Sequence, residues 1–202
     1  MDREQQIIVT GGTGYVGSRV ACALAERGYK VVVVDQVRPE ERGIRFPDGV
    51  EFRCHDLRHR TEALKGLAGG GVLMHLAADI GSLTYMHDHQ AEIITNNAAI
   101  DVAVYSAAKE RDIEWIIYSS SSMIYQHVSH YPYTEEDAKH VEPPSNVYGF
   151  SKLSGEFFCK AYRAQYNIPF TILRYHNVYG PGEDSKGSGP GDIHVIPALL
   201  EK

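Results

Sequence analysis

Short apolar runs alternate along this chain with longer stretches whose apolar residues recur at helical spacing. The first run leads directly into glycines, and the second ends at Asp35. Apolar strands that alternate with amphipathic helices predict βαβ units, a parallel sheet and right-handed crossovers. The expected fold class is therefore α/β, with a doubly wound parallel sheet. The expected strands cover residues 7–9, 31–34, 50–54, 72–76, 115–118 and 170–173, and the expected helices cover residues 15–27, 60–67, 90–111 and 147–166.

A glycine-rich turn, residues 11–17, joins the first expected strand to the first expected helix. Gly12, Gly14 and Gly17 satisfy G-x-G-x-x-G, and Gly11 with the last two satisfies the looser G-x-x-G-x-x-G. Such glycines permit a tight turn and a close approach of the backbone to a pyrophosphate. The N-terminus of the following helix offers free N–H groups to the phosphates. With a strand before it and a helix after it, this turn predicts a dinucleotide-binding site.

An acid lies at the expected distance from the glycines, at the end of the second strand. Asp35 can accept hydrogen bonds from ribose hydroxyls and repel a 2′-phosphate, which favours NAD over NADP. NADP stays an alternative because of Arg38, since an arginine near this position can bind the 2′-phosphate. Asp56, after the third strand, is either a partner for the adenine or a solvated loop acid.

Tyr148 and Lys152 are four residues apart on the fourth expected helix, so their side chains share one face. An ammonium beside a phenol favours the phenolate, which predicts a tyrosine pKa well below its usual value of about 10. Such a pair can take the proton from a sugar hydroxyl while a hydride leaves the same carbon.

The composition limits which partners the protein can bind and indicates the cellular compartment in which it works. The formal net charge of −6 and the lack of a basic stripe speak against nucleic-acid binding. Cys22, Cys54 and Cys159 form no C-x-x-C pair, and buried reduced thiols in a cytoplasmic protein are expected. We expect neither a signal peptide nor a membrane span. No metal site is predicted, since the run His87-Asp88-His89 is more typical of a solvated helix start.

Combined, these motifs make the chain resemble the extended short-chain dehydrogenases, the NAD-dependent nucleotide-sugar epimerases and dehydratases with a Rossmann-type sheet. Residues 75–78, HLAA, resemble the fourth-strand motif of the family, and residues 118–125, YSSSSMIY, resemble its fifth-strand serine motif. The resemblance implies a nucleotide-sugar substrate and assigns catalysis to Ser121, Tyr148 and Lys152. It implies cofactor binding by Gly11, Gly12, Thr13, Gly14, Tyr15, Val16, Gly17, Asp35, Asp56, Leu57, Leu76, Ala77, Ala78, Asn97, Tyr148 and Lys152, and substrate binding by Ser122, Met123, Asn177, Lys186 and His194.

The residues after Ser121 narrow the reaction that the resemblance implies. In 4,6-dehydratases the second acid–base pair lies where this chain has Ser122 and Met123, which cannot exchange protons in that way. Without a second acid–base pair, the reaction is limited to oxidation and re-reduction at one carbon. We therefore expect an isomerase that performs 4-epimerisation. Residues 76–82 and Lys186 resemble GDP-mannose 3,5-epimerase, although Met123 replaces the cysteine of its acid–base pair. A non-catalytic protein that binds NAD or a nucleotide sugar is the third alternative.

The resemblance also predicts how the chain is organised. Residues 1–176 are expected to form the NAD-binding domain and residues 177–202 the beginning of a substrate-binding domain, the rest of which is expected to be missing. Members of the family form homodimers through the two helices that correspond to residues 90–111 and 147–166. The resemblance therefore implies a homodimer. The apolar residues of those helices could equally be core; they are Ile100, Val104, Ala107, Leu153, Phe157 and Ala161.

Overall fold

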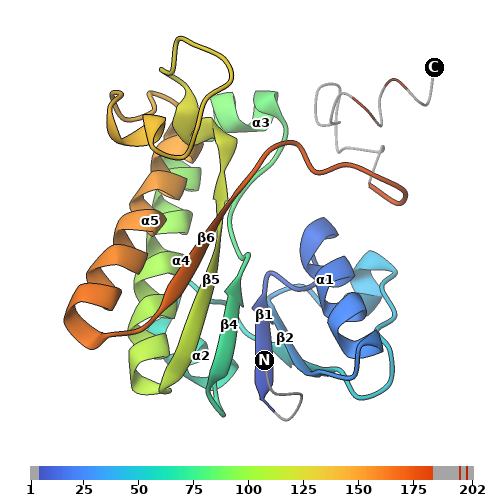
Figure 1. Cartoon of the computed structure of the whole chain (residues 1–202). Helices are drawn as coiled ribbons and strands as arrows, with labels where there is room; N and C mark the ends of the chain where they lie inside the picture. The colour runs from blue at the N-terminus through green and yellow to red at the C-terminus, as the bar shows by residue number, and fades with distance from the viewer. Residues whose placement is uncertain (1–4, 184–195, 197–198, 200–202) are drawn as a thin grey trace.

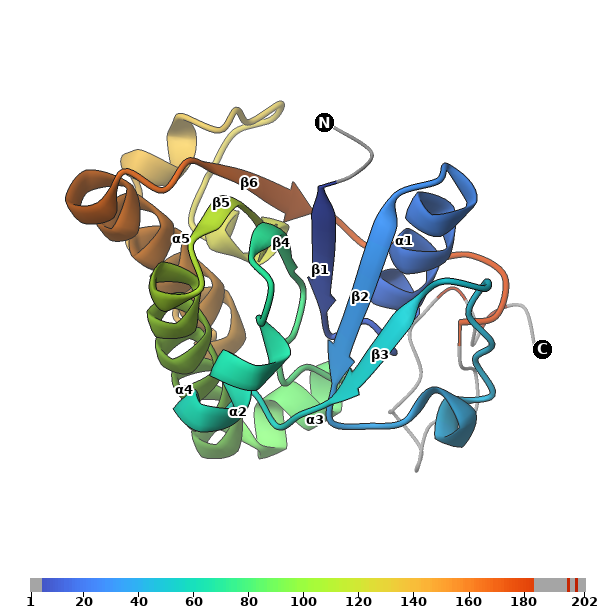
Figure 2. The ribbon, with the colours of Figure 1, turned by 90° about the horizontal axis from the view of Figure 1, so that it is seen from below.

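A computed structural model describes residues 5–183, 196 and 199 of the chain. Its strands form one parallel sheet in the order β3-β2-β1-β4-β5-β6 (Figures 1 and 2), which confirms the predicted fold class. The strand order reverses direction between β1 and β4, and such a switch point leaves a crevice outside the carboxyl ends of the strands. The strands are β1 Gln6–Thr10, β2 Lys30–Asp35, β3 Glu51–Cys54, β4 Gly71–His75, β5 Ile113–Ser121 and β6 Phe170–Tyr175.

Helices cover the two faces of the sheet unequally. Figure 2 shows α1 on one side of the sheet and α2, α4 and α5 on the other. The four predicted helices are present, and α3 is an addition. Their bounds are α1 Tyr15–Glu26, α2 Arg60–Gly66, α3 Leu83–Asp88, α4 Gln90–Glu110 and α5 Val147–Tyr166, with single 3-10 turns at Pro39–Arg42, Ser122–Tyr125 and Asp137–Lys139.

The sequence sets the ends of α5, the helix that carries Tyr148 and Lys152. Asn146 precedes the helix and its side chain accepts a hydrogen bond from the Gly149 N–H at 3.1 Å. Such a cap satisfies one of the N–H groups that a helix start leaves free. The helix ends where Asn167 adopts a left-handed conformation, with φ of 58°. The predicted catalytic pair is therefore held in the first two turns of a helix with a fixed start.

The two larger apolar clusters of the core lie one on each face of the sheet, and a smaller third cluster surrounds Tyr148. Val104 and Ala107 are fully buried in the cluster beneath α4, so these two residues are core and not a dimer face. Phe157 is 61% exposed on α5. Cys159 is buried, but Cys22 is half-buried and Cys54 is exposed, which corrects the expectation of three buried thiols, and all three cysteines are free.

The α1-side face of β5 and β6 has no helix over it in the described part of the chain. Trp115 of β5 lies on this face with 42% of its surface exposed, and its indole N–H donates to the Thr171 hydroxyl of β6 at 3.2 Å. Every residue of β6 is partly exposed. Within the described ranges, no helix is long and apolar enough to cross a membrane.

Candidate active site

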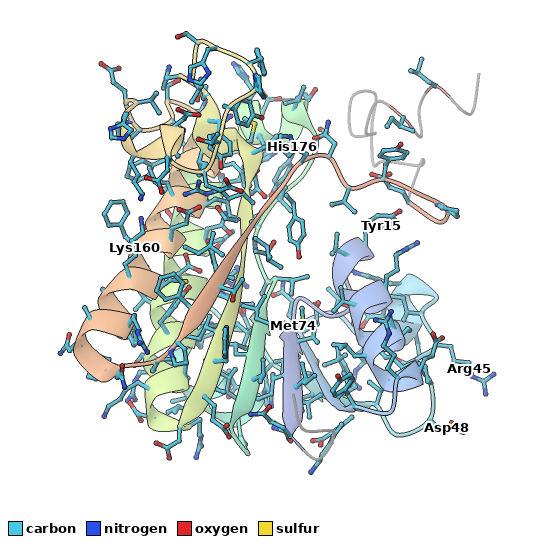
Figure 3. The ribbon with its side chains drawn as sticks, in the orientation of Figure 1. Tyr15, Arg45, Asp48, Met74, Lys160 and His176 are labelled. Atoms are coloured by element: carbon cyan, nitrogen blue, oxygen red, sulfur yellow. The ribbon has the colours of Figure 1, made fainter. Side chains whose placement is uncertain are left out.

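A cleft of about 1160 Å³ opens at the carboxyl ends of the strands, where the strand order reverses. In Figure 3, Tyr15 lies at the top of α1 and His176 lies beyond the end of β6, and both line the cleft. Gly12, Thr13 and Asn97 are buried behind its wall, and Lys186 and His194 lie outside the described residues. The other predicted site residues all line it: Gly11, Gly14, Tyr15, Val16, Gly17, Asp35, Asp56, Leu57, Leu76, Ala77, Ala78, Ser121, Ser122, Met123, Tyr148, Lys152 and Asn177.

The glycine turn packs too closely for side chains at three of its positions, Gly11, Gly12 and Gly17. Gly11 has φ of +66°, and a Cβ there would lie 2.8 Å from the backbone of Ala77. A Cβ on Gly17 would overlap the carbonyl oxygen of Gly11. The α1 N-terminus behind this turn has no side-chain cap and no acid in its first turn. Its N–H groups therefore remain available to an anion in the cleft.

Asp35 fixes this turn relative to β2. Its carboxylate accepts from the Thr13 N–H at 3.1 Å and from the Val37 N–H at 3.0 Å. Each carboxylate oxygen keeps a lone pair that can accept from a ribose hydroxyl. Arg38 does not line the cleft, whereas Arg42, which the sequence analysis did not single out, does.

Asp56 belongs to a polar chain along one wall of the cleft. Arg58 binds its carboxylate, which holds the pKa of Asp56 below its usual value. Arg58 also donates to Asn96, whose amide donates to Asp79 at 2.7 Å. The Tyr85 hydroxyl donates to the same Asp79 carboxylate at 3.0 Å. Asp56 is therefore bound by Arg58 and is not a free loop acid.

Asn97 supports the loop after β4 instead of lining the cleft. Its side chain accepts from the Asp79 N–H at 2.6 Å and donates to the Asp79 carbonyl. It also donates to the Ser151 hydroxyl, which donates to the Tyr148 carbonyl at 2.8 Å. Asn97 thus ties this loop to the helix that carries Tyr148, whereas the resemblance assigned it to cofactor binding.

Tyr148, Lys152 and Ser121 meet at the end of β5. The Lys152 ammonium lies 5.8 Å from the centre of the Tyr148 ring and donates to the Ser119 carbonyl at 2.8 Å. Ser121 forms a hydrogen bond with Tyr148. All three side chains are less than 10% exposed, with values of 7%, 4% and 8%.

Burial controls the protonation of this pair. It raises the pKa of Tyr148 to about 12, although the hydrogen bond with Ser121 opposes the rise. It lowers the pKa of Lys152 to about 8. The prediction of a lowered tyrosine pKa is therefore wrong for the protein by itself, because the cost of burying charge exceeds the effect of the neighbouring ammonium. Ionisation of Tyr148 requires further positive charge in the cleft.

A buried ion pair behind the serines was missed by the sequence analysis. Glu156 is fully buried, receives two hydrogen bonds of 2.9 Å from Arg174 of β6, and accepts from the Ser120 hydroxyl at 2.6 Å. Arg174 also donates to the Tyr125 hydroxyl at 2.7 Å. The helical spacing could have indicated Glu156, since it lies one further step of four residues beyond Lys152.

Comparison with known proteins identifies the class. Residues 7–202 match the NAD dependent epimerase/dehydratase family, and the chain belongs to this family. The chain is 32% identical to GDP-mannose 3,5-epimerase of Arabidopsis thaliana, over 93% of its own length and 52% of the relative's. It is 34% identical to ADP-L-glycero-D-manno-heptose-6-epimerase of Alkalilimnicola ehrlichii, over 97% of its length and 60% of the relative's.

A solved structure shares this fold. It is the UDP-glucose 4-epimerase of Thermotoga maritima with UDP-glucose, which matches with a TM-score of 0.83 at 26% identity, over 97% of this chain and 62% of that one. The chain therefore spans between about half and two thirds of the length of the proteins it resembles.

The residues of the cleft fit NAD, the cofactor of the family. The uncapped α1 N-terminus suits the pyrophosphate, and the Asp35 carboxylate suits unmodified ribose hydroxyls. Tyr148 and Lys152 border the same cleft at the end of β5.

Replacing Gly17 with alanine is expected to weaken NAD binding at least about tenfold, because the new Cβ displaces the Gly11 carbonyl and with it the turn. Calorimetric titration with NAD measures the change. Gly28→Ala is the control, since Gly28 has open space around it but a φ of +81°. This control should cost some stability and leave NAD affinity unchanged. Equal NAD affinity in Gly17→Ala and the wild type would contradict the assignment of the turn.

Proposed function

We propose that the chain is the cofactor-binding part of an NAD-dependent nucleotide-sugar epimerase that inverts C4 through a transient 4-keto sugar. The main support is the arrangement of the residues at the cleft. Ser121, Tyr148 and Lys152 meet there, and Ser122 and Met123 line the cleft beside them. Neither neighbour supplies a second acid–base pair. Proton and hydride exchange at a single carbon is the chemistry that these residues support.

Each residue then has a defined role. Ser121 donates a hydrogen bond to the O4 atom of the sugar, and Tyr148 accepts the proton of the C4 hydroxyl. Lys152 supplies positive charge next to the phenol. A bound NAD would supply the acceptor for the hydride of C4 and further positive charge in the cleft. Once the keto sugar has turned over and C4 is reduced from its opposite face, Tyr148 returns its proton to O4, so no atom is gained or lost.

The second candidate is a 3,5-epimerase. It is supported by the similarity to GDP-mannose 3,5-epimerase of Arabidopsis thaliana. Such a reaction removes and returns protons at C3 and C5, and it needs a proton-exchanging group other than Met123. Asp79 lines the cleft, but its carboxylate accepts hydrogen bonds from Tyr85 and Asn96. For this reason we favour 4-epimerisation.

The other parts of the proposal concern assembly. Residues 1–176 form the NAD-binding domain and residues 177–202 begin the substrate-binding domain, where Asn177, Lys186 and His194 contact the nucleotide sugar. The protein is cytoplasmic and forms a homodimer through α4 and α5. Exposed apolar side chains on these helices support the dimer: Val102 is 55%, Phe150 46% and Phe157 61% exposed.

The test is an NMR experiment in heavy water, in which the protein and NAD are incubated with UDP-, GDP-, ADP- and dTDP-sugars. Inversion at C4 without deuterium uptake is the expected result. Deuterium at C3 or C5 would favour the 3,5-epimerase. NAD binding with no change in any sugar would favour a non-catalytic binding protein and overturn the proposed activity.

A further inference from the structure

The chain after β6 leaves the edge of the sheet and runs across the carboxyl ends of the strands to α1 (Figures 1 and 2). We call this segment, residues 176–183, the strap. Its first four residues and its last one line the cleft, whereas residues 180–182 contact α1 on the opposite side. The strap therefore joins the two sides of the cleft at the edge where a cofactor would enter.

A tight turn lies at the α1 end of the strap. The Glu183 N–H donates to the Gly180 carbonyl at 3.3 Å, and the residues between them are Pro181 and Gly182. Gly182 has φ of +74°. Proline in the second position and a glycine with positive φ in the third position are typical of a type II turn. The Pro181 carbonyl takes no part in the hydrogen bond of the turn, so it can accept one from another element.

Arg19 of α1 binds this carbonyl. Its guanidinium donates to the carbonyl oxygens of Pro181 at 2.5 Å and Tyr15 at 2.8 Å, and it lies 3.8 Å from the centre of the Tyr15 ring. Two hydrogen bonds and an aromatic face fix the planar guanidinium in one position. The fit is close, since a Cβ on Gly180 would lie 3.0 Å from the Tyr15 hydroxyl and one on Gly182 would lie 2.9 Å from an Arg19 nitrogen.

This contact lies next to the glycine turn, where the cleft suits the pyrophosphate of NAD. Tyr15 is the first residue of α1 and lines the cleft, but Arg19, one helical turn further on, does not. Val178 and Tyr179 of the strap do line it. Arg19 can therefore act on a bound cofactor through the strap and not by touching it.

We propose that Arg19 fastens the strap across the cleft and thereby slows the release of NAD. Arg19 is a positioning residue in this arrangement, because it touches neither cofactor nor substrate. The inference rests on NAD binding and not on the reaction at C4. If the proposed 4-epimerisation holds, each turnover regenerates the cofactor, so slow release of NAD would cost no rate.

The test is a stopped-flow experiment in which the protein carries NADH, whose fluorescence reports binding, and is mixed with excess NAD. Arg19→Ala is expected to raise the dissociation rate constant of NADH about tenfold, the effect of one hydrogen bond made by a charged group. The association rate constant should not fall. Arg27→Ala is the matched control, because it removes an arginine at the other end of the same helix. This control should leave both rate constants unchanged.

Gly182→Ala tests the same contact from the side of the strap. Its new Cβ would displace the Arg19 guanidinium, and its positive φ disfavours alanine. Dissociation should therefore speed up as in Arg19→Ala. The double variant should release NADH no faster than the faster single variant, because both changes remove one contact.

Proteolysis gives a readout without cofactor. Tyr179 is 62% exposed, and chymotrypsin should cleave after it faster in Arg19→Ala and Gly182→Ala than in the wild type, with the site identified by mass spectrometry. Unchanged cleavage, an unchanged dissociation rate constant in Arg19→Ala, or additive effects in the double variant would overturn the inference. A fall in the association rate constant alone would also overturn it, since Arg19 would then be a steering charge. Failure of the sugar panel would remove only the proposed activity.

Discussion

Replacing Tyr148 with phenylalanine is expected to slow C4 inversion by about 10³-fold, the usual contribution of a positioned acid–base group. The change removes one hydroxyl and leaves the ring packed with Met86 and Ile93. NAD affinity should remain within about twofold, because a loss confined to the transition state lowers the rate and not ground-state binding. Sugar turnover by NMR and NAD titration by calorimetry measure the two quantities separately.

Tyr105→Phe is the matched control for this variant. Tyr105 is also fully buried and donates through its hydroxyl to the Gly155 carbonyl, but it does not line the cleft. The control should lose some stability and keep its turnover. If Tyr148→Phe retained more than about a tenth of the wild-type rate, another group would have to be the base.

Replacing Glu156 with glutamine is expected to lower the free energy of unfolding by about 3 to 5 kcal/mol, because one charge of a buried pair is left without its partner. Arg174 would keep its guanidinium, with only 14% of its side chain exposed, beside a neutral amide. Urea denaturation followed by circular dichroism measures the loss. Because Arg174 also donates to Tyr125, the end of β5 should loosen as well.

An exposed acid serves as the comparison for Glu156. Glu136 pairs with Lys139 on the surface, with side chains 70% and 58% exposed. Such pairs contribute little to stability, so Glu136→Gln should leave the urea midpoint unchanged. Equal midpoints for both variants would show that the Glu156–Arg174 pair contributes no more than a surface pair.

Local patterns in the sequence predicted most of the fold. The ends of α5 match the expected residues 147–166, because Asn146 and Asn167 provide helix boundaries. α3 was missed because it has six residues, too few for helical periodicity to be visible. β5 extends to Ser121, beyond the apolar residues, because its serines pair with Arg174 and Tyr175 of β6.

The site was predictable where its chemistry depends on spacing along the chain. The glycine turn, Asp35 and the Tyr148–Lys152 pair are of this kind, and all of them border the cleft except Gly12 and Thr13 behind it. Buried hydrogen bonds such as those of Thr10 with His75 and Glu156 with Arg174 join residues far apart in sequence, and no local pattern marks such contacts. The pKa directions of Tyr148 and Lys152 likewise depend on burial, which spacing does not give.

The open face of β5 and β6 gives the protein a natural optical probe. Trp115 is the single tryptophan of the chain and lies on that face, half in water. Any polypeptide that comes to cover β5 and β6 must remove water from its indole ring, which shifts emission to shorter wavelength and protects the ring from soluble quenchers. Assembly on this side of the sheet can thus be followed by fluorescence without labels, while Tyr148 and Lys152 of α5 lie near the opposite end of β5.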